Sequence, residues 1–108
     1  MNDRQNQDFN AILAESIRET IAQLLSPKVV ESVFEHLEKV YSIKKDEIPS
    51  RLDMLLLALE TIFGSRSSGV IGKAIARRLY SRLGLEFSDD PQMNLVGYVE
   101  KAKLEQQK

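Results

Sequence analysis

The hydroxyls, glycines and lysine of residues 64–74, GSRSSGVIGKA, are residue types that could bind phosphate. A phosphate loop requires Gly-x4-Gly-Lys-Ser/Thr directly after a strand, because backbone N–H groups and the lysine cradle the phosphates while the hydroxyl holds magnesium. Gly64 and Gly69 have this spacing, but Val70 stands where the lysine must be. The Gly-Lys pair comes three residues late, and Ala74 replaces the hydroxyl. These departures argue against a phosphate loop.

Basic side chains in and after this stretch are the second candidate for binding chemistry. If residues 67–83 form a helix, Arg66, Lys73 and Arg77 lie opposite its apolar face, and Arg78 lies at the boundary. We consider them candidates for binding an anion or an acidic partner: Arg66, Lys73, Arg77 and Arg78. The alternative interpretation is a solvated face on which the arginine stems cover apolar neighbours. No aromatic residue lies among these cations, which weakens the case for stacking on single-stranded nucleic acid.

The same segment carries small residues at helical spacing. On a helical wheel Gly72 falls within the apolar face, and Gly69 and Ala76 lie along its edge. A stripe without large side chains lets a second helix approach closely, at a cost of about 1 kcal/mol per helix-interior glycine. Gly69, Gly72 and Ala76 are therefore predicted to form a helix-crossing point.

Residues suited to catalysis or metal binding do not form a recognisable constellation. His36 is the only histidine, and it adjoins Glu35 on a predicted helix, where neighbouring side chains point apart. The pair Asp89-Asp90 is more simply explained as a helix N-terminal cap than as a metal site. We predict no catalytic residue, no cofactor and no metal site, and therefore no enzyme.

Five helical segments must position these residues, since apolar residues recur at steps of three and four and no alternating strand pattern occurs. The expected fold class is all-α, a single-domain bundle of about five helices. The predicted helices cover 8–25, 27–41, 51–63, 67–83 and residues from 91 onward. The predicted N-caps are Asp8, Ser26, Ser50, Ser67 or Ser68, and Asp89 or Asp90, the second and last pairing with Pro27 and Pro91. Gly64 and Gly84 are expected to end helices in a left-handed conformation.

Apolar residues on these helices predict the core. The expected buried positions are Phe9, Leu13, Ile17, Ile21, Leu24, Val30, Val33, Phe34, Leu37, Val40, Tyr41, Leu52, Leu55, Leu56, Leu59, Ile62, Phe63, Ile71, Ile75, Leu79, Leu83, Leu95, Val96, Val99 and Ala102. Ile43 and Ile48 are expected to pin their loop to this core. The helix at 51–63 is apolar nearly all round, which favours a central place in the bundle. The apolar surplus suggests that the chain forms a homodimer or docks to another helical protein.

Composition limits the other classes of function. The chain has 108 residues, a net charge of −1 and no cysteine, so disulfides and thiolate metal sites are excluded. The charge balance gives no overall attraction to nucleic acid or to an anionic membrane. The polar N-terminus lacks the apolar core of a secretory signal, and the longest apolar run is too short to span a bilayer. We expect a soluble cytoplasmic domain at 8–103, with flexible ends at 1–7 and 104–108.

Four short stretches together resemble a known family of archaeal domains. They are YSIKKDEIP at 41–49, ALETIFG at 58–64, LYSRLGLEF at 79–87 and YVEKAK at 98–103. The set is similar to the nitrosopumilus output domain family, and the resemblance spans about residues 26–103. It implies an all-α archaeal domain with an output role in signal transduction, and it supplies no catalytic or ligand residues.

Together these patterns predict a non-enzymatic helical module that transmits a signal by binding a protein partner, with a homodimer as one form. The alternative is a nucleic-acid-binding protein that uses the basic face of the fourth helix. A short turn before a basic helix resembles a helix-turn-helix in outline. However, the preceding helix is too apolar to lie along DNA, so nucleic acid is the less favoured partner.

Overall fold

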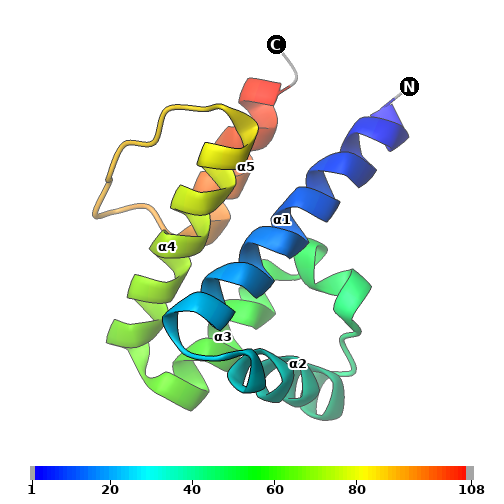
Figure 1. Ribbon diagram of the computed structural model, residues 1–108, viewed down its shortest axis with the longest axis vertical. Helices are drawn as coiled ribbons and strands as arrows, with labels where there is room; N and C mark the ends of the chain where they lie inside the picture. Colours follow the sequence, from blue (N-terminus) through cyan, green and yellow to red (C-terminus); the bar gives the residue numbers. More distant parts are fainter. Residues whose placement is uncertain (1, 107–108) are drawn as a thin grey trace.

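Five α-helices and one 3₁₀ helix make up the structure, and no strand occurs among the residues it describes (Figure 1). The computed structural model describes residues 2–106, with side chains from residue 8 onward. The elements are α1 (Asn2–Leu24), α2 (Pro27–Tyr41), η1 (Lys45–Ser50), α3 (Leu52–Phe63), α4 (Ser65–Leu83) and α5 (Leu95–Gln106). The predicted all-α class is confirmed. The start of α1 and the end of α5 lie at the same end of the molecule (Figure 1).

Helices α1 and α4 form the centre of the packing. α1 lies against α2, α4 and η1, while α4 also lies against α3 and α5. The α1 stripe at Leu13, Ile17 and Ile21 is completely buried, as are Ile75 and Leu79 of α4. Each such aliphatic side chain contributes about 1.5–3 kcal/mol when it leaves water, so these facing stripes hold the bundle together.

Local sequence signals explain α2 and the segment that follows it. The Ser26 side chain accepts a hydrogen bond from the Val29 N–H at 3.2 Å, with Pro27 as the first helical residue. After α2, Ile43 and Ile48 are 3% and 2% exposed. The predicted helix start at Ser26-Pro27 and the predicted burial of Ile43 and Ile48 are therefore confirmed. The segment between them is not an open loop, since residues 45–50 form the 3₁₀ helix η1.

The predicted N-caps of four helices are wrong. α1 begins at Asn2, before Asp8, and α3 begins at Leu52 without a side-chain cap, since the Ser50 hydroxyl donates to the Glu47 carbonyl instead. α4 begins at Ser65, directly after Gly64. α5 begins at Leu95 rather than Pro91. The predicted flexible ends fall partly on residues 1, 107 and 108, which lie outside the described residues.

The Asp90-Pro91 pair forms a turn instead of a helix start. The Met93 N–H donates to the Asp90 carbonyl, and the Gln92 N–H donates to the Asp90 side chain. Aspartate followed by proline also suits the first two positions of a type I turn. Asn94 caps α5, because its side chain accepts from the Gly97 N–H at 3.0 Å.

The two helix-ending glycines both adopt positive φ, but only Gly84 has the predicted left-handed conformation. Gly84 is left-handed (φ 70°, ψ 25°), and the Leu85 N–H reaches back to the Tyr80 carbonyl. Gly64 differs in detail, since its φ of 92° is combined with a ψ of 162°. This conformation lets Gly64 alone separate the end of α3 from the start of α4, and only glycine adopts it easily.

Several residues that were predicted to lie in the core are exposed. Those on α3 show that this helix is less central than predicted. Leu24, Val40 and Ile62 are 49%, 56% and 41% exposed, and Leu57 is 44% exposed. α3 is therefore not enclosed on all sides, although Leu52, Leu55 and Leu59 are buried as expected. Its apolar side chains outside the buried stripe lie at the surface, which contradicts the prediction that this helix is central in the bundle.

An aromatic cluster that the stripes did not predict fixes the connection between α4 and α5. Tyr80 and Tyr98 are each 2% exposed, and both rings contact Phe87. The Tyr80 hydroxyl donates to the Tyr98 carbonyl at 2.7 Å. The Tyr98 hydroxyl accepts from the Asp90 N–H at 2.7 Å and donates to the Ser88 carbonyl at 3.1 Å. Burial raises the pKa of Tyr80, so the phenol stays a donor.

Candidate functional site

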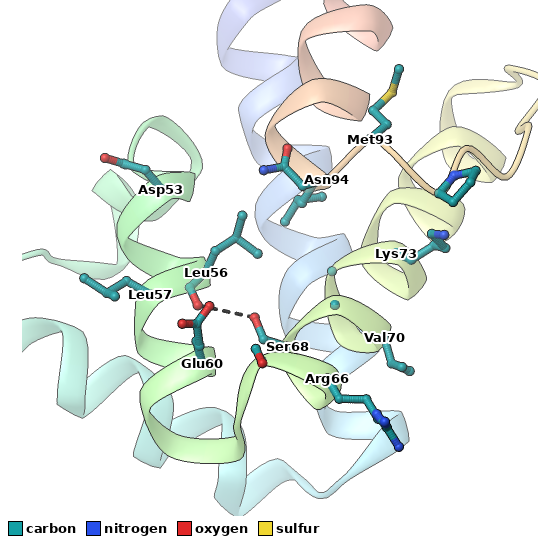
Figure 2. A pocket seen from close by; sticks show the side chains of 15 residues that line it. Asp53, Leu56, Leu57, Glu60, Arg66, Ser68, Val70, Lys73, Met93 and Asn94 are labelled. Atoms are coloured by element: carbon teal, nitrogen blue, oxygen red, sulfur yellow. Dashed lines mark hydrogen bonds between the residues drawn. The ribbon is translucent and has the colours of Figure 1, made fainter.

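A groove of about 650 Å³ lies between α3, the first half of α4 and the segment that enters α5 (Figure 2). One face of α3 forms a wall, with Leu56 and Leu57 between two carboxylates. The facing wall is the α4 surface from Ser65 to Lys73, and Met93 and Asn94 close the third side. This groove contains most of GSRSSGVIGKA, the stretch that sequence chemistry singled out.

The groove is lined by a mixture of exposed apolar groups and backbone. Val70 is 62% exposed on the α4 wall, and Leu57 is 44% exposed on the α3 wall. Figure 2 shows Leu57 pointing outward from α3 and Val70 outward from α4, away from each other, so that they lie at opposite rims of the groove with Leu56 between them. Exposed apolar surface rimmed by polar residues can mark a protein-interaction site.

The two glycines of the α4 wall have different roles. Gly72 is buried, and an ideal Cβ there would lie 3.4 Å from Leu56 Cδ2 and 3.6 Å from Leu95 Cβ. α4 therefore meets α3 and α5 at Gly72. An added Cβ at Gly69 would find no atom within 4 Å, so its prediction as a crossing residue is wrong. Gly69 instead leaves open space beside Val70.

Ala76 and Ser68 complete the contacts of α4 behind the groove. Ala76 is fully buried, as a small residue on the packed side of the helix. Ser68 is 5% exposed, and its hydroxyl donates to the Leu56 carbonyl at 3.3 Å (Figure 2). Because α4 begins at Ser65, Ser68 lies inside the helix and does not cap it as predicted, and its hydroxyl links α4 to α3 instead.

The charges of the groove are divided between its walls. Asp53 and Glu60 lie on α3, whereas Arg66 and Lys73 lie on α4. Asp53 has a 3.7 Å contact with Arg51. Neither Glu60 nor Arg66 has an ion pair or side-chain hydrogen bond with any side chain from residue 8 to 106. One wall therefore presents an unpaired anion, and the other presents an unpaired cation.

Lys73 has a partner at the outer edge of the groove. Its ammonium lies 2.6 Å from Asp89 Oδ1 in the α4–α5 connection. This hydrogen bond raises the pKa of Lys73 and lowers the pKa of Asp89, because each charge stabilises the other. Asp89 therefore pairs with a helix side chain and does not cap a helix as predicted.

The other two candidate cations lie outside the groove. The Arg77 guanidinium lies 5.3 Å from the centre of the Phe87 ring. Arg78 donates to the Gln23 side chain and lies 3.5 Å from Glu19, which also binds Arg82. Sequence reasoning grouped four cations on one helix, but the structure gives three of them partners within the chain.

The residue types that could serve in catalysis are not brought together in the structure. His36 packs edge-on against Tyr41, and its Nε2 is buried without a described hydrogen-bond partner. The hydroxyls of Ser16, Ser50 and Ser68 each donate to a backbone carbonyl. Within the described part of the chain, no three metal-ligating side chains gather at one place. None of its helices is long and apolar enough to cross a membrane.

Sequence reasoning missed Leu57, Glu60, Met93 and Asn94 as groove residues. The apolarity of α3 was a usable signal for Leu57, because an apolar residue outside the buried stripe must lie at a surface. Met93 and Asn94 gave no comparable signal, since their position depends on the turn at Asp90.

Comparison with known proteins gives no matching family model, and no curated protein or solved structure matches either.

Proposed function

We propose that this chain is a non-enzymatic helical module that binds a protein partner through the groove between α3 and α4. The observation that carries the proposal is the combination of two exposed aliphatic side chains, Leu57 and Val70, with unpaired charges of opposite sign on the two walls. Burying such aliphatic groups drives association, while complementary charges select the partner and its orientation. A small-molecule site would enclose its ligand more completely.

A signalling output role extends this proposal. It is supported by the similarity of residues 26–103 to the output domain family, and by the way in which the groove is built. Gly64 joins α3 to α4, Gly72 lies where α4 meets α3 and α5, and the aromatic cluster holds the α4–α5 connection, so the chain forms the groove without a partner. A preformed surface loses little conformational entropy on binding, which suits a module that transmits a signal by docking.

Nucleic-acid binding is the alternative proposal, and the charges support it less well. A phosphate backbone requires several cations that are free to replace counterions. Lys73 and Arg78 already contact carboxylates, and Arg77 lies over Phe87. A salt-dependent gel shift that is lost in a Lys73→Ala/Arg77→Ala variant would favour nucleic acid. No shift at low salt would remove this alternative.

Site-specific photocrosslinking tests the proposed function. A benzoylphenylalanine at position 70 is expected to give a discrete protein adduct in a lysate of the source organism, identified by mass spectrometry, either with another protein or with the same chain. The matched control is position 40, because Val40 is 56% exposed on α2, outside the groove. Equal adducts from both positions, or none from position 70, would contradict the proposal.

A further inference from the structure

We infer that the partner that fits this groove is a second copy of the same chain, related by a two-fold axis. This inference rests on the proposed function, because it names the protein that occupies the same site. In such a contact one surface patch meets itself, so every feature on the patch must find its complement on that patch. A patch that binds an unrelated protein needs only a complement on the other molecule.

The shape of the groove carries one pair of complementary features. Val70 projects from α4 with 62% of its surface exposed. Beside it, Gly69 is exposed and carries no side chain, and an ideal Cβ there would have no atom within 4 Å, so nothing obstructs a facing side chain. A two-fold axis near these residues would place each Val70 against the bare backbone at Gly69 of the facing copy. The exchange would remove two exposed aliphatic side chains from water.

Two unpaired charges provide the second pair of complementary features. Glu60 on α3 and Arg66 on α4 line the same groove, and neither has a charged partner among the described side chains. Figure 2 shows them on separate helices, with Arg66 extending outward from α4. In a two-fold dimer the Arg66 of each copy faces the α3 wall of the other, where Glu60 lies. Two reciprocal Arg66–Glu60 pairs then form, and an antiparallel placement is selected.

Charge reversal distinguishes this pairing between copies from a role of the same residues in the stability of the fold. Arg66→Glu or Glu60→Arg alone places like charges opposite each other, and each is expected to weaken self-association by about tenfold. The double variant restores opposite charges and should recover the affinity. An equimolar mixture of the two single variants should also associate, because one copy then carries two acids and the other two bases. Sedimentation equilibrium across a concentration series measures all four cases.

Val70 supplies the matched test of the apolar contact. Val70→Asp is expected to weaken self-association by more than about tenfold, whereas Val40→Asp, at a similarly exposed position outside the groove, should leave it unchanged. Circular dichroism confirms that each variant is folded. A monomer at every concentration, equal effects of the two aspartates, or failure of the mixed charge variants to associate would each overturn the inference. A position-70 adduct with a different protein would then still support the proposed function.

Discussion

Lys73 Nζ lies 2.6 Å from Asp89 Oδ1, and this pair ties the outer face of α4 to its connection with α5. The hydrogen bond from Lys73 lowers the pKa of Asp89. The contribution of Asp89 to stability is therefore complete above its ordinary pKa and is lost as the pH falls through the lowered folded value. Lys73, with a raised pKa, contributes below its ordinary value and loses that contribution as the pH rises through the raised one.

The measurement is a carbon-13 NMR titration of the Asp89 carboxyl in the wild type and in Lys73→Met. We expect a midpoint below the ordinary aspartate value in the wild type and a higher midpoint in the variant. Lys73→Arg serves as the control, because it retains a cation. Identical midpoints in wild type and Lys73→Met would show that the pair does not form in solution.

The Tyr98 hydroxyl is expected to stabilise the α4–α5 connection. Tyr98→Phe leaves the Asp90 N–H without its 2.7 Å acceptor, which should lower the free energy of unfolding by about 1–3 kcal/mol. Tyr41→Phe is the control, because no described group bonds to the Tyr41 hydroxyl. Urea denaturation compares the two, and equal losses would argue against the proposed anchor.

Gly72 and Gly69 should respond differently to added side chains. Gly72→Leu has no room beside Leu56 and Leu95, and the overpacking should cost about 1–3 kcal/mol or more. Gly72→Ala should change stability little, because its methyl would lie 3.4 Å from Leu56 Cδ2, at the lower limit of ordinary contact, and this crowding offsets the gain in helix propensity. Gly69→Ala should stabilise α4 by up to about 1 kcal/mol, since nothing opposes the methyl. Thermal unfolding gives the order, and an unchanged Tm for Gly72→Leu would refute the close crossing at Gly72.

Glu19 should link α1 to α4 through electrostatics of modest strength. Its carboxylate contacts Arg78 and Arg82, and all three side chains are about one-third exposed. Glu19→Gln should therefore lower the free energy of unfolding by about 0.2–1 kcal/mol at low salt. The difference should shrink as salt screens the charges. A loss that does not depend on salt would point to packing rather than charge.

The fold was predictable where one short stretch decides one feature. Ser26-Pro27 starts α2 and Gly84 ends α4 because each local motif satisfies backbone groups with its own atoms. The Asp90-Pro91 pair gave a wrong helix start because the same dipeptide suits both a helix start and a type I turn. The choice is settled by Tyr98, whose hydroxyl holds the Asp90 N–H from eight residues away. The residues adjacent to Asp90 in the sequence do not predict that contact.

The site was less predictable than the fold. The helical wheel placed Arg66 and Lys73 on an outward face correctly, and both line the groove. It did not foresee that Arg78 would pair with Glu19, which is distant in the sequence, or that Gly69 would border a hollow rather than a helix. A free cation can be distinguished from a paired one only when the packing of separate helices is known.

The most direct test of the account is to follow the backbone amide resonances during dilution of the isotopically labelled chain. We predict that the amides of Leu57, Gly69 and Val70 shift progressively with concentration, while that of Val40 does not, and that Val70→Asp abolishes the shifts. Shifts confined to surfaces outside the groove, or no shift at any concentration, would contradict the claim that this groove is where the chain meets a copy of itself.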